Sequence, residues 1–162
     1  MTDYRIEVTT LRPQPTLSLR FSARPDELGA RFGEVLPRVL ECARASGAAI
    51  AGAPFGRYHM MGESVFRIEA GVPVAEPLAE LPAEPDVGGE EIQASSLPGG
   101  RAATTTHVGP YEQLGEAHDA LYQWAAENHE TASGGSWEVY LTDPGEEPNP
   151  QNWRTRVFLP LE

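Results

Sequence analysis

The stretch FRIEAGVPV at residues 66–74 is matched near the end of the chain by WRTRVFLPL at residues 153–161. Both stretches begin with an aromatic residue and an arginine, and both end with a proline between two apolar residues. Upstream, FGRY at 55–58 matches WEVY at 137–140. A repeat of about 80 residues is too long for a solenoid unit. The pairing therefore predicts two similar modules joined as a pseudo-dimer, with a groove between them as the natural place for a ligand.

Hydrophobic periodicity predicts the same order of elements in both halves. Alternating and apolar runs predict strands at 5–11, 16–22, 55–61, 64–70, 91–97, 101–108, 136–142 and 153–159. Apolar residues at helical spacing predict one helix from Asp26 to Gly47 and another over 111–128. Leu28 and Leu114 hold the same phase of the two helical patterns. The expected fold class is therefore α+β, with two tandem β-β-α-β-β modules and antiparallel sheet.

The domain organisation follows from the repeat and from one biased segment. Residues 75–90 contain three prolines, two glycines and five acidic residues, which is typical of an exposed connector. We therefore expect one domain over residues 1–162, with a first module at about 4–74 and a second at about 91–162.

Composition excludes several classes of partner. The 24 acidic residues outnumber the 12 basic ones and give a formal net charge of −12. This balance argues against nucleic acid and against an anionic membrane surface, and it favours a cationic ligand or a basic protein. The chain opens on polar residues and has no apolar run of the ~18 residues that a membrane span needs. We expect a soluble cytoplasmic protein. The single cysteine, Cys42, excludes an intrachain disulfide.

Glu138 is the strongest candidate for a functional side chain. Successive residues of a strand point to opposite faces, so Trp137 and Val139 face one way while Glu138 and Tyr140 face the other. The repeat matches Glu138 with Gly56, which has no side chain. A buried carboxylate needs hydrogen bonds or a cation, because its desolvation is costly. The alternative is a solvent-facing glutamate on an ordinary two-sided strand.

Aromatic and histidine residues also correspond between the halves. The repeat pairs Tyr58 with Tyr140, Phe55 with Trp137, Phe66 with Trp153, His107 with Phe21, and His118 with Phe32. Aromatic faces suit flat hydrophobic ligands and attract cations, although the same residues could simply pack in a core. The match with two phenylalanines favours core or pocket-lining roles for both histidines. No residues have metal-ligand spacing, and neither a G-x-S-x-G elbow nor a phosphate loop occurs, so we expect no metal and no cofactor.

The second half also resembles a known family. LPGGRAATTTHVGPYEQLGEAHDALYQWAAENH at 97–129, WEVYLTDP at 137–144 and the terminal WRTRVFLPL resemble the GyrI-like small-molecule-binding family. That family includes the effector-binding domains of AraC-type and MerR-type multidrug regulators. The resemblance implies two SHS2-like modules with an aromatic-lined cleft between them and one buried glutamate, which falls on Glu138. The ligand-binding residues expected here are Glu138, Tyr140, Tyr58, Trp153, Tyr111, Phe55 and His107.

Three functions are compatible with this resemblance. The chain begins at its first strand and ends at its last, so we expect a stand-alone member without a DNA-binding segment. The favoured function is binding of small, hydrophobic, cationic or planar organic compounds. The first alternative is a hydrolase of cyclopropane-bearing compounds, with Glu138 as general base and Tyr140 or Tyr111 as proton donor. The second is a gyrase-inhibitor-like interaction protein with an unknown protein partner. Binding is favoured because hydrolysis also needs an ordered water and a proton donor.

Overall fold

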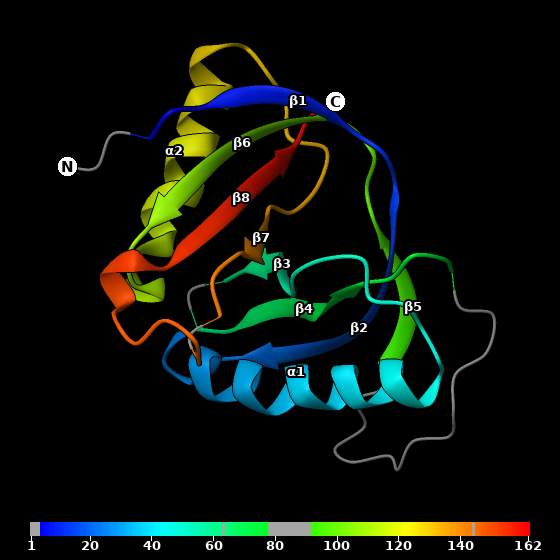
Figure 1. The fold of residues 1–162 in the computed structure, drawn as a ribbon. Helices are drawn as coiled ribbons and strands as arrows, with labels where there is room; N and C mark the ends of the chain where they lie inside the picture. Colours follow the sequence, from blue (N-terminus) through cyan, green and yellow to red (C-terminus); the bar gives the residue numbers. More distant parts are fainter. Residues whose placement is uncertain (1–3, 63, 78–91, 144) are drawn as a thin grey trace. The chain divides into compact units, whose positions relative to one another are not determined.

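The computed structural model describes residues 4–62, 64–77, 92–143 and 145–162, and its chain divides into two compact units (Figure 1). The N-terminal unit comprises Pro13–Pro98, and the C-terminal unit comprises Met1–Arg12 together with Gly99–Glu162. The connector predicted at 75–90 falls largely on residues 78–91, which lie outside the described part. Neither helix of the described part combines the length and apolar character needed to cross a bilayer.

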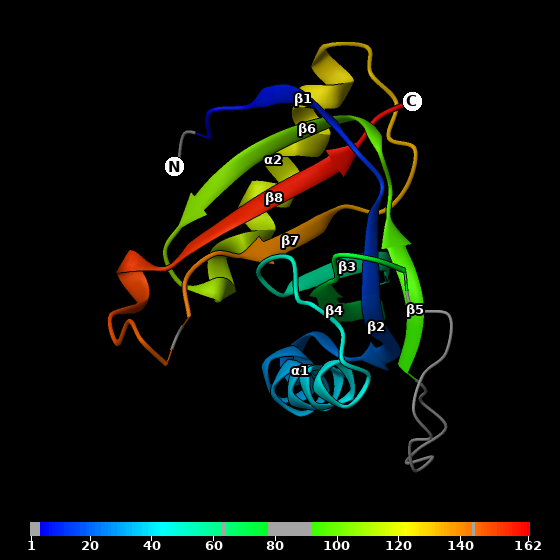
Figure 2. The same ribbon diagram turned by 45° about the vertical axis from the view of Figure 1, so that its right-hand side comes forward.

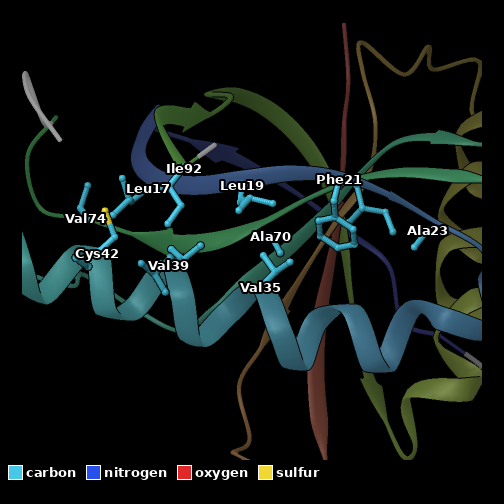
Figure 3. Close-up of a cluster of buried hydrophobic side chains, with 13 residues drawn as sticks. Leu17, Leu19, Phe21, Ala23, Val35, Val39, Cys42, Ala70, Val74 and Ile92 are labelled. Atoms are coloured by element: carbon cyan, nitrogen blue, oxygen red, sulfur yellow. The ribbon is translucent and has the colours of Figure 1, made fainter. Parts of the chain in front are cut away.

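The N-terminal unit is a four-stranded antiparallel sheet with one helix on one face. Its elements are β2 (Gln14–Ala23), α1 (Leu28–Ala45), β3 (Phe55–Met61), β4 (Phe66–Pro73) and β5 (Ile92–Leu97). The strand order within this unit is β5-β2-β4-β3. Figure 2 shows α1 beside β2 and β4. Alternate residues of β2, such as Leu17 and Leu19, face Val35 and Val39 on α1 and form the core (Figure 3).

The C-terminal unit repeats this architecture. Its elements are β1 (Glu7–Leu11), β6 (Gly100–Val108), α2 (Leu114–Glu127), β7 (Trp137–Tyr140) and β8 (Arg154–Pro160). The strand order within the unit is β1-β6-β8-β7, and β1, β6 and β8 lie side by side with α2 across one face (Figure 1). A short 3-10 turn precedes each helix, at Pro25–Glu27 before α1 and at Tyr111–Gln113 before α2. The predicted α+β class with antiparallel sheet is therefore confirmed.

The pairing of the strands confirms the equivalences read from the repeat. Phe21 on β2 is paired with Ile68 on β4. His107 on β6 is paired with Thr155 on β8, 86 and 87 residues further along the chain. The two units therefore share one register, and a residue of one unit can be compared directly with its counterpart in the other.

The first strand of each predicted module lies in the opposite unit. Ala94 of β5 is paired with Leu17 of β2, and Val8 of β1 is paired with Ala103 of β6. A division at 4–74 and 91–162 therefore does not describe the compact units. The links supply a physical reason: β1 and β2 are joined by Arg12-Pro13, and β5 and β6 by Pro98-Gly99. Proline cannot adopt the positive φ that a two-residue type I′ hairpin turn requires at both central positions.

Candidate functional site

Glu138 points into the interior of the C-terminal unit. It lies on β7 and is only 2% exposed. Its partner across the sheet is Val157 of β8, which belongs to the core beneath α2. Cross-strand partners in an antiparallel sheet project from the same face. Glu138 therefore lies on the face that α2 covers, and the alternative of a solvent-facing glutamate is wrong.

Glu138 is the centre of a hydrogen-bonded group, which we call the Glu138 cluster: the buried residues Ser136, His118 and Glu138 and the half-buried Tyr140. His118 Nε2 lies 2.7 Å from Glu138 Oε1, and His118 Nδ1 lies 2.7 Å from Ser136 Oγ. The Tyr140 hydroxyl donates to Glu138 Oε2 at 2.7 Å. Both carboxylate oxygens thus have partners, which offsets the desolvation of a buried charge.

The chemistry of these groups determines which atom donates and which accepts in each hydrogen bond of the cluster. An ionised carboxylate can only accept, so the His118 Nε2–H donates to Glu138. A neutral His118 ring then accepts from the Ser136 hydroxyl at Nδ1, whereas a protonated ring donates there. The charge of the cluster is therefore −1 with a neutral ring and zero with a protonated one.

The N-terminal unit shows that the fold does not require these polar residues. The counterpart of Glu138 is Gly56, which is paired with Ala70 as Glu138 is paired with Val157. The counterpart of His118 is Phe32. Phe32 packs edge-on against Phe21, with ring centroids 5.7 Å apart. At these positions the space between helix and sheet is therefore apolar in the N-terminal unit, whereas in the C-terminal unit it holds a carboxylate and an imidazole. This contrast favours a functional role for the Glu138 cluster.

Three aromatic rings border the cluster. The Tyr111 ring lies 5.5 Å from that of Tyr140 and 4.7 Å from that of Trp153. All three side chains are half-buried. Burial, and then the negative charges of Glu138 and Asp143, raise the pKa of Tyr111. The Tyr111 hydroxyl therefore stays protonated and can donate. We refer to Tyr111, Tyr140 and Trp153 as the aromatic border.

An unsatisfied hydroxyl lies next to this group. Thr155 is fully buried, and its Oγ1 has no hydrogen-bond partner among the residues that the structure describes. It is the cross-strand partner of Tyr140, and its counterpart in the N-terminal unit is Ile68. Buried polar atoms are rarely left without a partner. Thr155 Oγ1 is therefore a candidate contact for a bound molecule or water, and sequence reasoning missed it.

His107 lies in the same unit but has its own partners. Its Nδ1 accepts from the Tyr4 hydroxyl at 2.8 Å, and its Nε2 donates to the Pro110 carbonyl at 3.1 Å. Burial, and then the charge of Glu116, raise the pKa of Tyr4. His107 is thus a satisfied, buried histidine beside α2, and the contribution of Tyr4 was not predicted.

Two predicted site residues belong to the N-terminal unit. Tyr58 packs edge-on against Phe66, with centroids 6.1 Å apart, beside the core under α1. Phe55 is buried opposite Gly71. The structure thus brings together Glu138 and the aromatic border, while a cleft between the modules that also uses Tyr58 and Phe55 stays a prediction.

Sequence reasoning placed His118 inside but missed its bond to Glu138. The repeat carried a usable signal, because His118 and Glu138 replace Phe32 and Gly56 at interior positions. Within the described ranges, no group of three or more His, Cys, Asp or Glu side chains is arranged so that it could hold a metal ion.

Comparison with known proteins identifies the family. A family model described as a GyrI-like small molecule binding domain matches residues 4–162. A search of curated proteins gave no match to this chain.

Solved structures share the fold at low identity. EcmrR in its DNA complex has a TM-score of 0.79 and 21% identity; the match covers 98% of this chain but 57% of that one. The EcmrR C-terminal domain has a TM-score of 0.77 and 21% identity, with 98% of both chains covered. SAV2435 bound to tetraphenylphosphonium has a TM-score of 0.60 and 7% identity, covering 99% and 94%. A hydrolase from Listeria innocua has a TM-score of 0.61 and 13% identity, covering 98% and 92%.

Proposed function

Because the chain belongs to the family of GyrI-like small-molecule-binding domains, we propose that it binds hydrophobic organic compounds that are cationic or planar. The Glu138 cluster would supply the counter-charge, and the aromatic border would supply the walls. The observation that carries this proposal is the buried carboxylate at a position where the sister unit has glycine.

The chemistry of the site suits a lipophilic cation. The negative charge of Glu138 is already desolvated, so a cation that approaches it meets a stronger attraction than it would in water. The faces of Tyr111, Tyr140 and Trp153 attract the same positive charge and stack on flat rings. A net charge of −12 adds a favourable field for the approach of a cation.

Tyr140 links the two parts of the proposed site. Its hydroxyl donates to Glu138, and its ring packs on Tyr111. A ligand that contacts the aromatic border would therefore also contact the side chain that holds Oε2 of the carboxylate. The charge of the ligand would lie close to the Glu138 carboxylate, and its rings would contact the aromatic border. This arrangement predicts a preference for cations over neutral compounds of similar size.

Calorimetric titration of wild type and Glu138→Gln with two probes tests the proposal. Tetraphenylphosphonium supplies the cation, and triphenylphosphine oxide supplies a neutral compound with similar rings. Losing one charge-assisted contact costs about 1.5–3 kcal/mol, which corresponds to about 10–150-fold in Kd. We expect that loss for the cation and little change for the neutral probe.

Two outcomes would count against the proposal. An equal loss for both probes would mean that Glu138 maintains the shape of the site only. Failure of both probes, and of a wider panel of aromatic cations, to bind the wild-type protein would remove the binding function itself. A circular dichroism spectrum of Glu138→Gln controls for loss of fold.

One observation supports hydrolysis as a second candidate. Glu138 and the tyrosine hydroxyl that could return a proton are already hydrogen-bonded, with Tyr111 beside them. In this alternative Glu138 takes a proton from water, the hydroxide adds to an electrophilic ring carbon, the strained C–C bond breaks, and a tyrosine protonates the leaving carbon. Binding stays the favoured proposal because hydrolysis also needs Oε2 to exchange Tyr140 for a water.

A further inference from the structure

A second buried carboxylate lies in the N-terminal unit, on the sheet face away from α1. Glu69 on β4 lies between Ile68 and Ala70, which both pack into the α1 core, so Glu69 points to the opposite face. Its cross-strand partners are Arg20 on β2 and Arg57 on β3. Three neighbouring strands thus place a guanidinium, a carboxylate and a second guanidinium in one row.

The carboxylate of Glu69 is fully occupied. The Ser18 hydroxyl donates to Oε2 at 2.5 Å, His59 Nε2 donates to Oε1 at 2.7 Å, and Arg20 Nε lies 3.6 Å from Oε1. Burial raises the pKa of Glu69, but these bonds and charges outweigh burial and hold the pKa below its ordinary value. We call Ser18, Arg20, His59 and Glu69 the Glu69 cluster. Its carboxylate holds Arg20 and His59 in place.

Arg20 and His59 each have nitrogen atoms that the Glu69 cluster does not use. Arg20 uses only Nε in these contacts, and 63% of its side chain is exposed. His59 uses only Nε2, and 28% of its side chain is exposed. Within the described part of the chain, the terminal nitrogens of Arg20 and the Nδ1 of His59 have no protein partner. Both side chains approach the same carboxylate oxygen, Oε1 of Glu69, so the two cationic side chains are neighbours on this sheet face.

The surrounding charge is positive although the protein is acidic. Arg57 and Arg67 share this sheet face, since Arg67 lies two residues before Glu69 on β4. Burial, and then the neighbouring charge of Arg20, lower the pKa of Arg57 against the opposing effect of Glu69. Three arginines and one glutamate therefore share this part of the sheet face, and a protonated His59 would add a further positive charge.

The sister unit shows that the sheet does not require this arrangement. The C-terminal unit has different residues at the equivalent positions: Thr104 for Ser18, Val139 for Arg57, Leu141 for His59 and Arg156 for Glu69. There Arg156 Nε donates to Thr104 Oγ1 at 3.1 Å, without a carboxylate. Buried ionic groups also add little stability over apolar packing of similar volume. The fold of the unit therefore does not require the Glu69 cluster.

We propose that Arg20 and His59, positioned by Glu69, bind a doubly charged oxyanion such as a phosphate group. The terminal nitrogens of Arg20 match two oxygens of such a group in a forked hydrogen bond. His59 donates to a third oxygen through Nδ1–H in the protonated state of the ring, because a neutral ring that donates through Nε2 can only accept at Nδ1. Arg57 and Arg67 add unspecific attraction. This site is separate from the Glu138 cluster and goes beyond the proposed binding of organic cations.

Titration with inorganic phosphate, at an ionic strength held constant with chloride, tests the proposal. The readouts are calorimetry and the imidazole resonances of His59, assigned with His59→Gln. We expect saturable binding by the wild type and a loss of about tenfold or more in Arg20→Gln and His59→Gln, because each removes a charge-assisted bond. Arg101→Gln is the matched control, since Arg101 is an exposed arginine paired with Glu130 in the C-terminal unit. It should bind phosphate as the wild type does.

Further arms separate the outcomes. Phenyl phosphate tests the source of the anion. If the natural ligand carries its phosphate on an organic molecule, phenyl phosphate should bind more tightly than inorganic phosphate. If the natural ligand is the free anion, the two should bind equally well. Glu138→Gln should leave phosphate binding unchanged, so failure of the cation site would not affect this result. Arg20 is exposed, so Arg20→Gln should fold normally. The proposal is overturned if neither phosphate binds saturably, or if Arg20→Gln and Arg101→Gln bind equally well.

Discussion

Glu138 and Gly56 occupy the same position of two copies of one module, and only Glu138 lies beneath a histidine. The position of that histidine, His118, is filled in the other copy by Phe32. The two copies share strand register and a 3-10 turn before the helix. Each unit therefore serves as an internal reference for the other. The polar pair His118 and Glu138 can be tested by substituting the residues that the N-terminal unit has at these positions.

Exchanging the pair tests whether His118 and Glu138 act together. We expect His118→Phe and Glu138→Gly each to lower the free energy of unfolding by about 1–3 kcal/mol, because each leaves a buried polar partner unsatisfied. The double variant restores the Phe32–Gly56 combination and should lose less than the sum, with a coupling energy of about 0.5–3 kcal/mol. Urea unfolding of the four proteins measures this. Additive losses would show that the two side chains do not depend on each other.

Thr155→Val tests the unsatisfied hydroxyl beside Tyr140. Valine keeps the branched shape and removes the polar atom, as Ile68 does in the N-terminal unit. We expect the free energy of unfolding to rise by about 1 kcal/mol or more, because an unpaired buried hydroxyl is costly. If a ligand uses Oγ1, an aromatic cation with an N–H donor should bind more weakly to the same variant, whereas tetraphenylphosphonium, which has no hydrogen-bonding atom, should bind equally well. A variant with lower stability would show that Oγ1 is already satisfied by a water.

The repeat in the sequence accounts for most of what could be predicted. It placed both helices and all the named strands to within a few residues, and it matched Glu138 with Gly56 and His118 with Phe32. These matches rest on local periodicity, which a single sequence records well. From the sequence, β1 and β5 were assigned to the wrong units, because strand pairing depends on the short links that contain Pro13 and Pro98.

Contacts between residues far apart in the chain were also not predicted from the sequence. His118 and Glu138 lie 20 residues apart on a helix and a strand, and their bond depends on how α2 rests on the sheet. Tyr4 and His107 lie 103 residues apart and meet only because β1 pairs with β6. The cluster around Glu69 was not predicted, because its partners come from two other strands, β2 and β3.

Trp153→Leu tests the aromatic border. The change keeps an apolar side chain and removes a ring that packs at a tilt against Tyr111. We expect weaker binding of both tetraphenylphosphonium and triphenylphosphine oxide, with an extra loss of about 0.5–2 kcal/mol for the cation from the lost cation–π attraction. Tyr122→Leu, at an exposed position of α2, is the control and should change neither. Unchanged binding in Trp153→Leu would exclude this ring from the site.

Acid titration of stability tests the state of Glu69. Its pKa in the folded protein is lowered from an ordinary 4.5, so the unfolded chain binds more protons in this range. The stabilisation is therefore complete above pH 4.5 and is lost as pH falls through the lower folded value. Glu69→Gln should be about 1.5–3 kcal/mol less stable than wild type at pH 7, with a smaller difference below pH 4.5. Glu41→Gln, at an exposed position of α1, is the control. A difference that does not change with pH would contradict an ionised Glu69.

The last prediction separates a binding protein from an enzyme at the Glu138 cluster. If Glu138 is a general base, Glu138→Gln should keep most binding of a neutral substrate and lose about 10²–10⁴-fold in turnover, because an amide has the same shape but cannot take a proton. Mass spectrometry of electrophilic compounds after long incubation would show whether water has been added.

Two tyrosine variants make this distinction sharper. Tyr140→Phe removes the hydroxyl bonded to Oε2, and Tyr111→Phe removes a hydroxyl whose raised pKa keeps it protonated. In an enzyme, the variant that lacks the proton donor should lose turnover and retain affinity. In a binding protein, both variants should alter only Kd. Compounds that are bound and recovered intact from the wild type would end the enzymatic alternative, since capture requires the charge of Glu138 but no proton transfer.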